Sequence, residues 1–457
     1  MPSECDDHFN DECGVFGVWN GENAGYNTVL GLHALQHRGQ ESGGIVTYDR
    51  VSKTSNVIKR NGVINSSFSQ ADIDSLCGKF AIGHVRYSTS GGKDGDDGIQ
   101  PFVLNSGEQI IAVAHNGNFT NSTEVRGELI ASGAEFSTEI DTENLIHLIA
   151  RHGSDKAGIV QAALKLQGAF SILVMTKDFI CAFRDPSGIR PLSIGKIGEA
   201  VVFASETCAF SICGAEFVRD VLPGEVVFIS NSGIESSFPF QKMEPKFCIF
   251  EYVYFARPDS IVEGRNVYNV RKKIGQQLAI ESKIDADVVV PVPDSGVPAA
   301  IGFSNESGIP MELGIVRSHY VGRTFIDPTQ QARSNKVLMK HSPNAAIVEG
   351  KRVVLIDDSI VRGTTSKKIV KMLKDAGAKE VHMRISSPPT KFSCFYGIDT
   401  PNSSDLIANN HSVEEIRKYL GADSLSYLST EGLYKAVRGD EKQTGFCNAC
   451  FTGDYFL

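Results

Sequence analysis

The sequence predicts a two-part α/β protein whose second half contains a parallel sheet. Residues 353–356, Val-Val-Leu-Ile, form an apolar run without alternation, which is typical of a strand covered by helices on both faces. Residues 287–292, Asp-Val-Val-Val-Pro-Val, contain a second run of this kind. In the first half, short apolar runs separated by turn residues predict an antiparallel sheet; they lie at 171–175, 180–183, 201–205 and 225–229.

The run at 353–356 leads into a candidate phosphate site. Asp357 and Asp358 follow it, and a Gly-Thr-Thr turn at 363–365 precedes residues 367–376, whose apolar residues have helical spacing. A turn before a helix directs main-chain N–H groups, hydroxyls and the positive end of the helix dipole at one point, which suits a phosphate. The two carboxylates could hold a ribose diol and Mg²⁺. Asp-Asp alone is more often a solvated acidic pair, but the whole string 353–366 resembles the phosphoribosyl-pyrophosphate loop of type I phosphoribosyltransferases.

Composition excludes several classes of protein. The chain has 457 residues and a net charge of −9, without a cluster of Lys and Arg, so a nucleic-acid partner is not expected. No apolar run is long enough to span a membrane, and the first twelve residues are acidic, unlike a signal peptide. We therefore expect no membrane partner and a cytoplasmic location. Ten cysteines are too few for a disulfide scaffold in a chain of this length.

Cys13 is the candidate nucleophile of the first half. It opens the string Cys-Gly-Val-Phe-Gly after a short polar prefix. If residues 1–12 are removed as a propeptide, Cys13 supplies both a thiol and a free α-amine, whose pKa is roughly 7.7–8.0. Taken alone, a Cys-Gly pair is more often a buried cysteine at the start of a core strand.

Three later strings favour the catalytic interpretation. Gln-His-Arg-Gly-Gln stands at 36–40, and His-Val-Arg-Tyr-Ser-Thr at 84–89 supplies an arginine that can bind a carboxylate in a bidentate manner. His-Asn-Gly at 115–117 offers an amide side chain and a glycine N–H that could form an oxyanion hole, although such a string is also an ordinary turn.

Together with Cys13, these strings resemble the amino-terminal-nucleophile (Ntn) glutaminase domain of class II glutamine amidotransferases. The resemblance implies a four-layer αββα sandwich built on antiparallel sheets. It also implies that Cys13 attacks the glutamine side chain and that Asn116 and Gly117 stabilise the oxyanion. The residues that it assigns to glutamine binding are Arg86, Thr89, Asp141, Arg38 and Gly39.

A polar stretch at 230–244 marks the expected boundary, so we predict a propeptide at 1–12, a glutaminase domain at 13–243 and a phosphoribosyltransferase domain at 244–457. Beyond the second buried run, the basic segment 317–340 is either a solvated loop or one that closes over a polyanion. The type I phosphoribosyltransferase resemblance assigns phosphoribosyl-pyrophosphate binding to Asp294, Ser295, Gly296, Arg323, Lys336, Asp357, Asp358, Ser359, Arg362, Gly363, Thr364 and Thr365. It assigns Mg²⁺ to Ser295, Asp357 and Asp358.

A Cys-x-x-Cys at 447–450 is a third candidate site near the carboxyl end. By itself it could be a redox dithiol, half of a zinc site or two buried thiols, and four thiolates would suit zinc or an iron–sulfur cluster equally. Spacing does not identify the other two ligands.

Over nearly its whole length the chain resembles the glutamine phosphoribosylpyrophosphate amidotransferases, in the branch with a propeptide and a [4Fe–4S] cluster. That resemblance implies cluster ligands at Cys248, Cys394, Cys447 and Cys450, with zinc as the alternative. It also implies an amidotransferase that converts phosphoribosyl pyrophosphate and glutamine to 5-phosphoribosylamine, pyrophosphate and glutamate in purine biosynthesis. Inhibition by purine nucleotides and a homotetramer are further expectations.

Two other classes would share part of these features. A different glutamine amidotransferase would lack the 353–365 loop. A non-catalytic phosphoribosyl-pyrophosphate-binding regulator would keep that loop, but it should have a basic DNA-binding segment and no reason to retain Cys13, Arg86 and Asn116.

Overall fold

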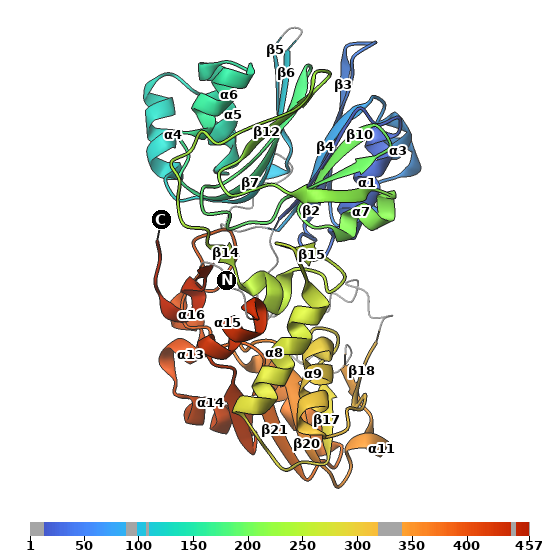
Figure 1. Ribbon diagram of the computed structural model, residues 1–457, viewed down its shortest axis with the longest axis vertical. Coiled ribbons are helices and arrows are strands. Elements are labelled where there is room, and N and C mark those ends of the chain that lie inside the picture. Colours follow the sequence, from blue (N-terminus) through green and yellow to red (C-terminus); the bar gives the residue numbers. More distant parts are fainter. Residues whose placement is uncertain (1–12, 88–97, 107–108, 319–340, 440–444, 457) are drawn as a thin grey trace.

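The computed structural model describes residues 13–87, 98–106, 109–318, 341–439 and 445–456, and its two parts follow one another along the long axis of the molecule (Figure 1). The first part carries two large antiparallel sheets, and the second carries a smaller parallel sheet. The predicted two-part α/β architecture is confirmed.

Two sheets packed face to face form the first part. In order across the first sheet lie β11 (Glu216–Asp220), β9 (Ser193–Ile197), β10 (Ala200–Ala204), β1 (Gly14–Trp19), β4 (Phe80–Arg86), β2 (Ser42–Asp49) and β3 (Thr54–Asn61). The second sheet is β13 (Gly233–Ser237), β12 (Val226–Ser230), β8 (Phe179–Arg184), β7 (Gly168–Thr176), β6 (Gln109–Phe119) and β5 (Phe102–Ser106). A core that includes Val15, Ile82, Leu173 and Ala182 fills the space between the sheets.

Helices cover the outer faces of both sheets, which completes the four layers that the sequence predicts. The first sheet is covered by α1 (Ala24–Ala34), α2 (Ile64–Ser67), α3 (Gln70–Ser75) and α7 (Cys208–Cys213). The second sheet is covered by α4 (Ser122–Ala131), α5 (Thr142–His152) and α6 (Lys156–Ala163). In α5 the apolar residues Leu145, Leu148 and Ile149 face the sheet, as the helical period requires.

The second part is built on the parallel sheet β17 (Val288–Pro291), β20 (Arg352–Asp357), β21 (Glu380–Ile385) and β22 (Ser424–Tyr427). One core joins its first face to α8 (Val267–Glu281), α9 (Val297–Ser307) and α15 (Thr430–Arg438). Another joins the opposite face to α11 (Ala345–Val348), α12 (Thr364–Asp375), α13 (Ile407–Asn410) and α14 (Val413–Leu420). Strand β20 is central and apolar on both faces, as predicted from its unbroken run.

Short elements connect and close the two parts. The parallel pair β14 (Phe247–Cys248) and β23 (Phe446–Cys447) joins the start of the second part to the carboxyl end of the chain. The remaining elements are the π-helix η2 (Glu251–Phe255), β15 (Ile261–Val262), β16 (Arg265–Asn266), β18 (Ile315–Arg317), β19 (His341–Pro343), the 3₁₀ helix η3 (Ser403–Asp405) and α16 (Ala449–Thr452).

Three details differ from the sequence-based expectation. The apolar runs at 171–175, 180–183 and 225–229 are neighbours in the second sheet, whereas the run at 201–205 becomes β10 of the first sheet. Helix α12 begins at Thr364, three residues earlier than expected, because Gly363 with φ of 79° supplies the turn directly before it. The polar stretch at 230–244 contains β13, the edge strand of the second sheet.

None of the described helices is long and apolar enough to cross a membrane.

Candidate functional site

Cys13 lies directly before β1, at the end of the first sheet. Its side chain is buried, and its Sγ donates to the main-chain oxygen of Tyr87 at 3.6 Å. Burial raises the pKa of the Cys13 thiol to about 11, while the nearby charge of Arg86 acts to lower it and that of Asp141 acts to raise it. The thiol therefore lies close to a cation and a carboxylate that the sequence assigned to the same site.

Asn116 and Gly117 lie on β6, in the facing sheet. The Asn116 side chain is fully buried, and neither its nitrogen nor its oxygen has a hydrogen-bond partner in the described part of the chain. Gly117 has a φ of 143°, and a Cβ there would lie 2.0 Å from the carbonyl oxygen of Ala169. Only glycine fits this position, and the unpartnered amide beside it is available to a ligand.

Asp141 and Arg86 have partners that fix their positions. Asp141 precedes α5 and accepts the main-chain N–H of Phe119 at 2.9 Å. Burial alone would raise the pKa of Asp141, but His115 and the Phe119 N–H outweigh burial and hold it below its usual value. Arg86, half-buried at the end of β4, donates to the carbonyl oxygen of Gly98 at 2.8 Å.

Gly39 packs against the backbone that carries Arg86. A Cβ on Gly39 would lie 2.6 Å from the carbonyl carbon of Val85 and 2.7 Å from the nitrogen of Arg86. Only glycine at this position therefore lets the two backbone segments approach so closely.

Arg38 lies in a group of buried charged residues. Its side chain is fully buried and donates to the carbonyl oxygen of Cys13 at 3.2 Å, to Glu206 at 2.6 Å and to Glu251 at 2.8 and 3.0 Å. Burial alone would raise the pKa of Glu206, but His37 and Arg38 hold it far below its usual range. The Arg38 guanidinium thus belongs to an ion-pair network beneath Cys13.

Glu206 and Glu251 were not identified from the sequence. Glu206 also accepts the main-chain N–H of Arg257 at 2.8 Å and the Ser260 hydroxyl at 2.7 Å, so it bridges both parts of the chain. Glu206 lies in no recognised motif, and Glu251 stands in the aromatic-rich segment 246–260 at the domain junction, where most side chains are expected to be core.

The second candidate site lies at the carboxyl end of β20. Asp357 and Asp358 are buried, the Asp358 N–H donates to Asp357 Oδ1 at 3.0 Å, and Ser359 Oγ donates to Asp358 Oδ1 at 2.6 Å. The other oxygen of Asp358 is buried without a hydrogen-bond partner among the described residues. The amino end of α12, with Thr364 and Thr365, follows directly, and Arg362 stands in the same turn.

The loop after β17 lies beside this turn. A Cβ on Gly296 would lie 2.5 Å from the carbonyl oxygen of Ile356, which places the loop containing Asp294 and Ser295 against the end of β20. Asp294 is exposed and forms an ion pair with Arg317 on β18. Both loops lie at the carboxyl edge of the parallel sheet, where ligands bind in open α/β sheets.

The four candidate cluster cysteines lie between the two parts. Cys248 and Cys447 are partners in the β14–β23 pair, Cys450 is in α16, and Lys391 and Phe392 donate their main-chain N–H groups to the Cys450 carbonyl oxygen near Cys394. Burial raises the pKa of Cys248 to about 11. Arg190 is fully buried next to these thiols: burial alone would lower its pKa, but Cys248, Cys394 and Glu251 raise it.

Some predicted residues fall outside the description. Thr89, Arg323, Lys336 and the prefix 1–12 lie among residues whose placement is not described. Among the described residues, one set of three potential ligands has its donor atoms within 4.8 Å of one another: His37, Glu206 and Cys208. Glu206 there is already paired with Arg38, which disfavours a cation.

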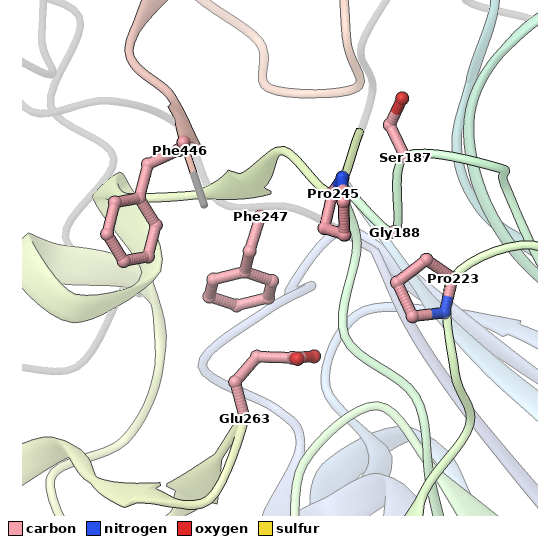
Figure 2. Close-up of a pocket in the computed structure, with 8 residues that line it drawn as sticks. Ser187, Gly188, Pro223, Pro245, Phe247, Glu263 and Phe446 are labelled. Atoms are coloured by element: carbon pink, nitrogen blue, oxygen red, sulfur yellow. The ribbon is translucent and has the colours of Figure 1, made fainter. Parts of the chain in front are cut away.

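A small cavity opens where the parts meet (Figure 2). Its walls include Ser187, Pro223, Glu263 and the rings of Phe247 and Phe446, which precede Cys248 and Cys447 on β14 and β23. None of the predicted substrate-binding residues lines it, so this cavity is not the substrate site.

Comparison with known families matches both parts of the chain. A glutamine amidotransferase domain matches residues 84–211, and a phosphoribosyl transferase domain matches residues 259–386. The chain is 50% identical over 461 residues to the amidophosphoribosyltransferase of Rhizobium etli, covering 98% of this chain and 92% of that protein. It is 50% identical over 451 residues to the Bacillus subtilis amidophosphoribosyltransferase, covering 98% and 94%.

Solved structures agree with these matches over the full fold. The glutamine phosphoribosylpyrophosphate amidotransferase of B. subtilis, solved with ADP and GMP, superimposes with a TM-score of 0.91 at 49% identity and covers 97% of both chains. A structure described as the allosteric regulatory enzyme of purine biosynthesis gives a TM-score of 0.92 at 49% identity, covering 97% of this chain and 96% of that one. With a thiol site in the first part and a phosphate-type loop in the second, the chain belongs to the amidophosphoribosyltransferases, the glutamine phosphoribosylpyrophosphate amidotransferases of purine biosynthesis.

Proposed function

We propose that Cys13 releases ammonia from glutamine and that the Asp357-Asp358 loop binds the phosphoribosyl pyrophosphate that accepts it. The products are glutamate, pyrophosphate and 5-phosphoribosylamine. The observation that carries this assignment is the Asn116 amide, which is buried with both polar atoms unpartnered in the described structure. A native protein seldom buries such a group unless a ligand satisfies it. An oxyanion that forms when Cys13 attacks an amide is a ligand of the right kind.

The chemistry at Cys13 requires a base. With the thiol pKa raised to about 11 by burial, little thiolate is present at neutral pH, so the proton must leave as the sulfur attacks. Removal of residues 1–12 would give Cys13 a free α-amine with a pKa of roughly 7.7–8.0, suited to this transfer. Arg86 then pairs with the α-carboxylate of glutamine and Asp141 with its α-amino group, while Arg38, Gly39 and Thr89 line the pocket.

At the acceptor site, main-chain N–H groups at the start of α12 and the hydroxyls of Ser359, Thr364 and Thr365 hold the 5-phosphate. Asp357 and Asp358 hold the ribose hydroxyls. The unpartnered oxygen of Asp358 suits a hard cation, and Ser295, Asp357 and Asp358 would hold Mg²⁺. When bound, Mg²⁺ neutralises charge on the leaving pyrophosphate. Asp294, Gly296, Arg323, Lys336, Arg362 and Gly363 complete the proposed binding set.

We assign a [4Fe–4S] cluster to Cys248, Cys394, Cys447 and Cys450, in preference to zinc. Cys248, Cys394 and Cys447 all act to raise the pKa of the buried Cys450 thiol, so the four thiols form one group, the cysteine cage. Four thiolates suit a four-iron cluster, and the buried Arg190 guanidinium beside them would offset its negative charge. The preference for a cluster over zinc rests on the resemblance to the cluster-bearing branch of the family. The proposed transfer of ammonia involves no electron transfer, so the role we assign to the cluster is structural or oxygen-sensing.

The remaining proposals concern organisation and control. We place the domain boundary between residues 243 and 244. The active chain is proposed to start at Cys13, and the protein is proposed to be a cytoplasmic homotetramer. Inhibition by purine nucleotides is proposed because the related B. subtilis structure was solved with ADP and GMP.

One assay tests the division into two sites. Pyrophosphate release from phosphoribosyl pyrophosphate and Mg²⁺ is measured anaerobically with glutamine or with ammonium as the nitrogen source. Cys13→Ala should abolish release with glutamine and leave release with ammonium. Loss of both activities in a folded variant, or retention of both, would contradict the proposal.

A further inference from the structure

The turn that follows Cys394 packs directly on the end of β6, where the proposed oxyanion residues Asn116 and Gly117 lie. Asn118, next to Gly117 on β6, donates its side-chain N–H to the carbonyl oxygen of Phe395 at 3.0 Å. A Cβ built on Gly397 would lie 2.7 Å from the Cα of Gly117 and 2.9 Å from its carbonyl carbon. Side-chain carbons do not approach so closely, so two glycine backbones from opposite parts of the molecule are in contact here.

The end of β6 has no room to move away from this contact. On its other side Gly117 meets β7, where a Cβ would lie 2.0 Å from the carbonyl oxygen of Ala169. The main chain of Gly117 therefore lies between β7 of the first part and Gly397 of the second. Its position is set by both.

A second contact from the second part of the molecule reaches Cys13. Glu251, at the start of η2, binds the Arg38 guanidinium with both carboxylate oxygens, at 2.8 and 3.0 Å. Arg38 in turn donates its Nε–H to the carbonyl oxygen of Cys13 at 3.2 Å. All three side chains are buried, so water does not compete for these bonds.

From these contacts we propose that the phosphoribosyltransferase part completes the glutaminase site. Gly397 and Glu251 are positioning residues: Gly397 sets the main chain of the oxyanion hole, and Glu251, through Arg38, sets the main chain of the nucleophile. This inference rests on the proposed roles of Cys13 and Gly117. It goes beyond them because neither positioning residue touches glutamine and both lie outside the matched glutamine amidotransferase domain at 84–211.

The expected effect follows from what each contact holds. Donors of an oxyanion hole act at roughly 2.7–3.1 Å, so a shift of a few tenths of an ångström at Gly117 weakens stabilisation of the transition state. The groups that recognise the ends of glutamine are Arg86 on β4 and Asp141 before α5, whereas the atoms nearest to a Cβ on Gly397 all belong to Gly117. Displacing Gly117 should therefore lower kcat for glutamine with little change in KM.

Gly397→Ala is the direct test, and Gly133→Ala is its matched control. Gly397 has a φ of 100° and Gly133 a φ of 94°, so both substitutions impose similar backbone strain. A Cβ on Gly133 meets nothing within 4 Å, whereas a Cβ on Gly397 meets Gly117. We expect Gly397→Ala to lower glutamine-dependent kcat about tenfold or more, with KM and ammonium-dependent pyrophosphate release within twofold of the unchanged protein. Gly133→Ala should leave all three values within twofold.

Glu251→Gln provides a test that adds no atoms to the interface. It keeps the shape of the side chain and removes the charge that binds Arg38. The matched control is Glu225→Gln, which neutralises a buried carboxylate directly before β12 that pairs with Arg219 on β11. We expect glutamine-dependent kcat to fall in Glu251→Gln alone, while ammonium-dependent release persists in both.

The outcomes separate this inference from the proposed function. If Cys13→Ala keeps glutamine-dependent release, the assignment of Cys13 fails and the inference fails with it. If Cys13→Ala loses that activity but Gly397→Ala matches Gly133→Ala, or Glu251→Gln matches Glu225→Gln, the proposed function stands and the corresponding positioning role is refuted. A rise in KM at unchanged kcat would also overturn it, because the contacts would then serve binding.

Discussion

Replacement of Asn116 by alanine should lower glutamine-dependent activity without lowering the stability of the fold. The amide is fully buried with neither polar atom hydrogen-bonded in the described structure, and leaving such a group unsatisfied costs about 1–3 kcal/mol of folding free energy. Alanine removes both atoms and leaves a small cavity worth about 1 kcal/mol in the opposite direction. We therefore expect the folded state to be unchanged or up to about 2 kcal/mol more stable. Loss of an oxyanion-hole donor should lower glutamine-dependent kcat by about 10²–10³-fold.

Two measurements decide this prediction. The midpoint of chemical denaturation, followed by a signal from the first part, gives the stability change, and glutamine hydrolysis gives kcat. Asn144→Ala is a useful comparison, because Asn144 is equally buried but its side-chain N–H groups donate to Ser122 at 2.9 and 3.0 Å, so its loss should destabilise the fold and spare kcat. If Asn116→Ala lowers stability by more than about 2 kcal/mol, the amide has a structural partner and the reasoning is wrong. Retained kcat would refute the oxyanion role.

Three further predictions concern the acceptor site, pH and the cysteine cage. Asp357→Asn combined with Asp358→Asn should abolish pyrophosphate release with ammonium while basal glutamine hydrolysis continues; preserved release in this double variant would remove both residues from the acceptor site. The folded-state pKa of Glu206 lies below its ordinary value of 4.5, so its stabilising contribution is present above about pH 4.5 and is lost as the pH falls toward the folded-state value. The stability difference between unchanged protein and Glu206→Gln, from denaturation midpoints, should therefore shrink on acidification from pH 7 to 3.5, and a constant difference would contradict the ion-pair assignment. Anaerobically purified protein should be coloured and contain about four irons per chain, as a [4Fe–4S] cluster requires, whereas colourless protein with one zinc would refute the cluster.

Sequence patterns predicted those parts of the molecule that depend on local chemistry. The unbroken run before Asp357 predicted a strand buried on both faces, and β20 is that strand. The Gly-Thr-Thr turn predicted the helix that follows, and α12 begins there. Cys13, Asn116 and Asp141 were grouped by resemblance, and the structure brings the Asp141 charge close to the Cys13 thiol although 128 positions separate them in the numbering.

Long-range packing could not be predicted from the sequence in the same way. Nothing in the string Phe250-Glu251-Tyr252 indicates that its carboxylate binds Arg38, because that contact joins residues 213 positions apart and depends on how two parts dock. The requirement for glycine at position 397 comes from the Gly117 backbone and not from its own sequence neighbours. The assignment of the run at 201–205 to a different sheet from its neighbours also depends on tertiary pairing, which apolar content alone does not specify.

A buried ion-pair network beneath Cys13 raises the question of why apolar side chains do not fill this space. Removing charges from water is costly, and well-packed apolar residues of similar volume are often at least as stabilising as a buried pair. A carboxylate that binds a guanidinium through both oxygens fixes direction as well as distance, which apolar contacts do not. Arg38 uses one N–H for the Cys13 carbonyl and the others for Glu206 and Glu251, so a single planar group ties the nucleophile to carboxylates from both parts.

Arg190, with its NH1 at 3.7 Å from Glu251, extends the same network to the cysteine cage. The cage therefore contacts the glutaminase site by two routes, through Arg190 and Glu251 to Cys13, and through the turn after Cys394 to Gly117. A group bound between the four cysteines would fix the starting points of both. On this argument the charges are retained for orientation. Replacing Glu251 alone by an apolar residue of similar size should therefore lower glutamine-dependent turnover and also destabilise the fold, because Arg38 and Arg190 would each lose a buried carboxylate partner.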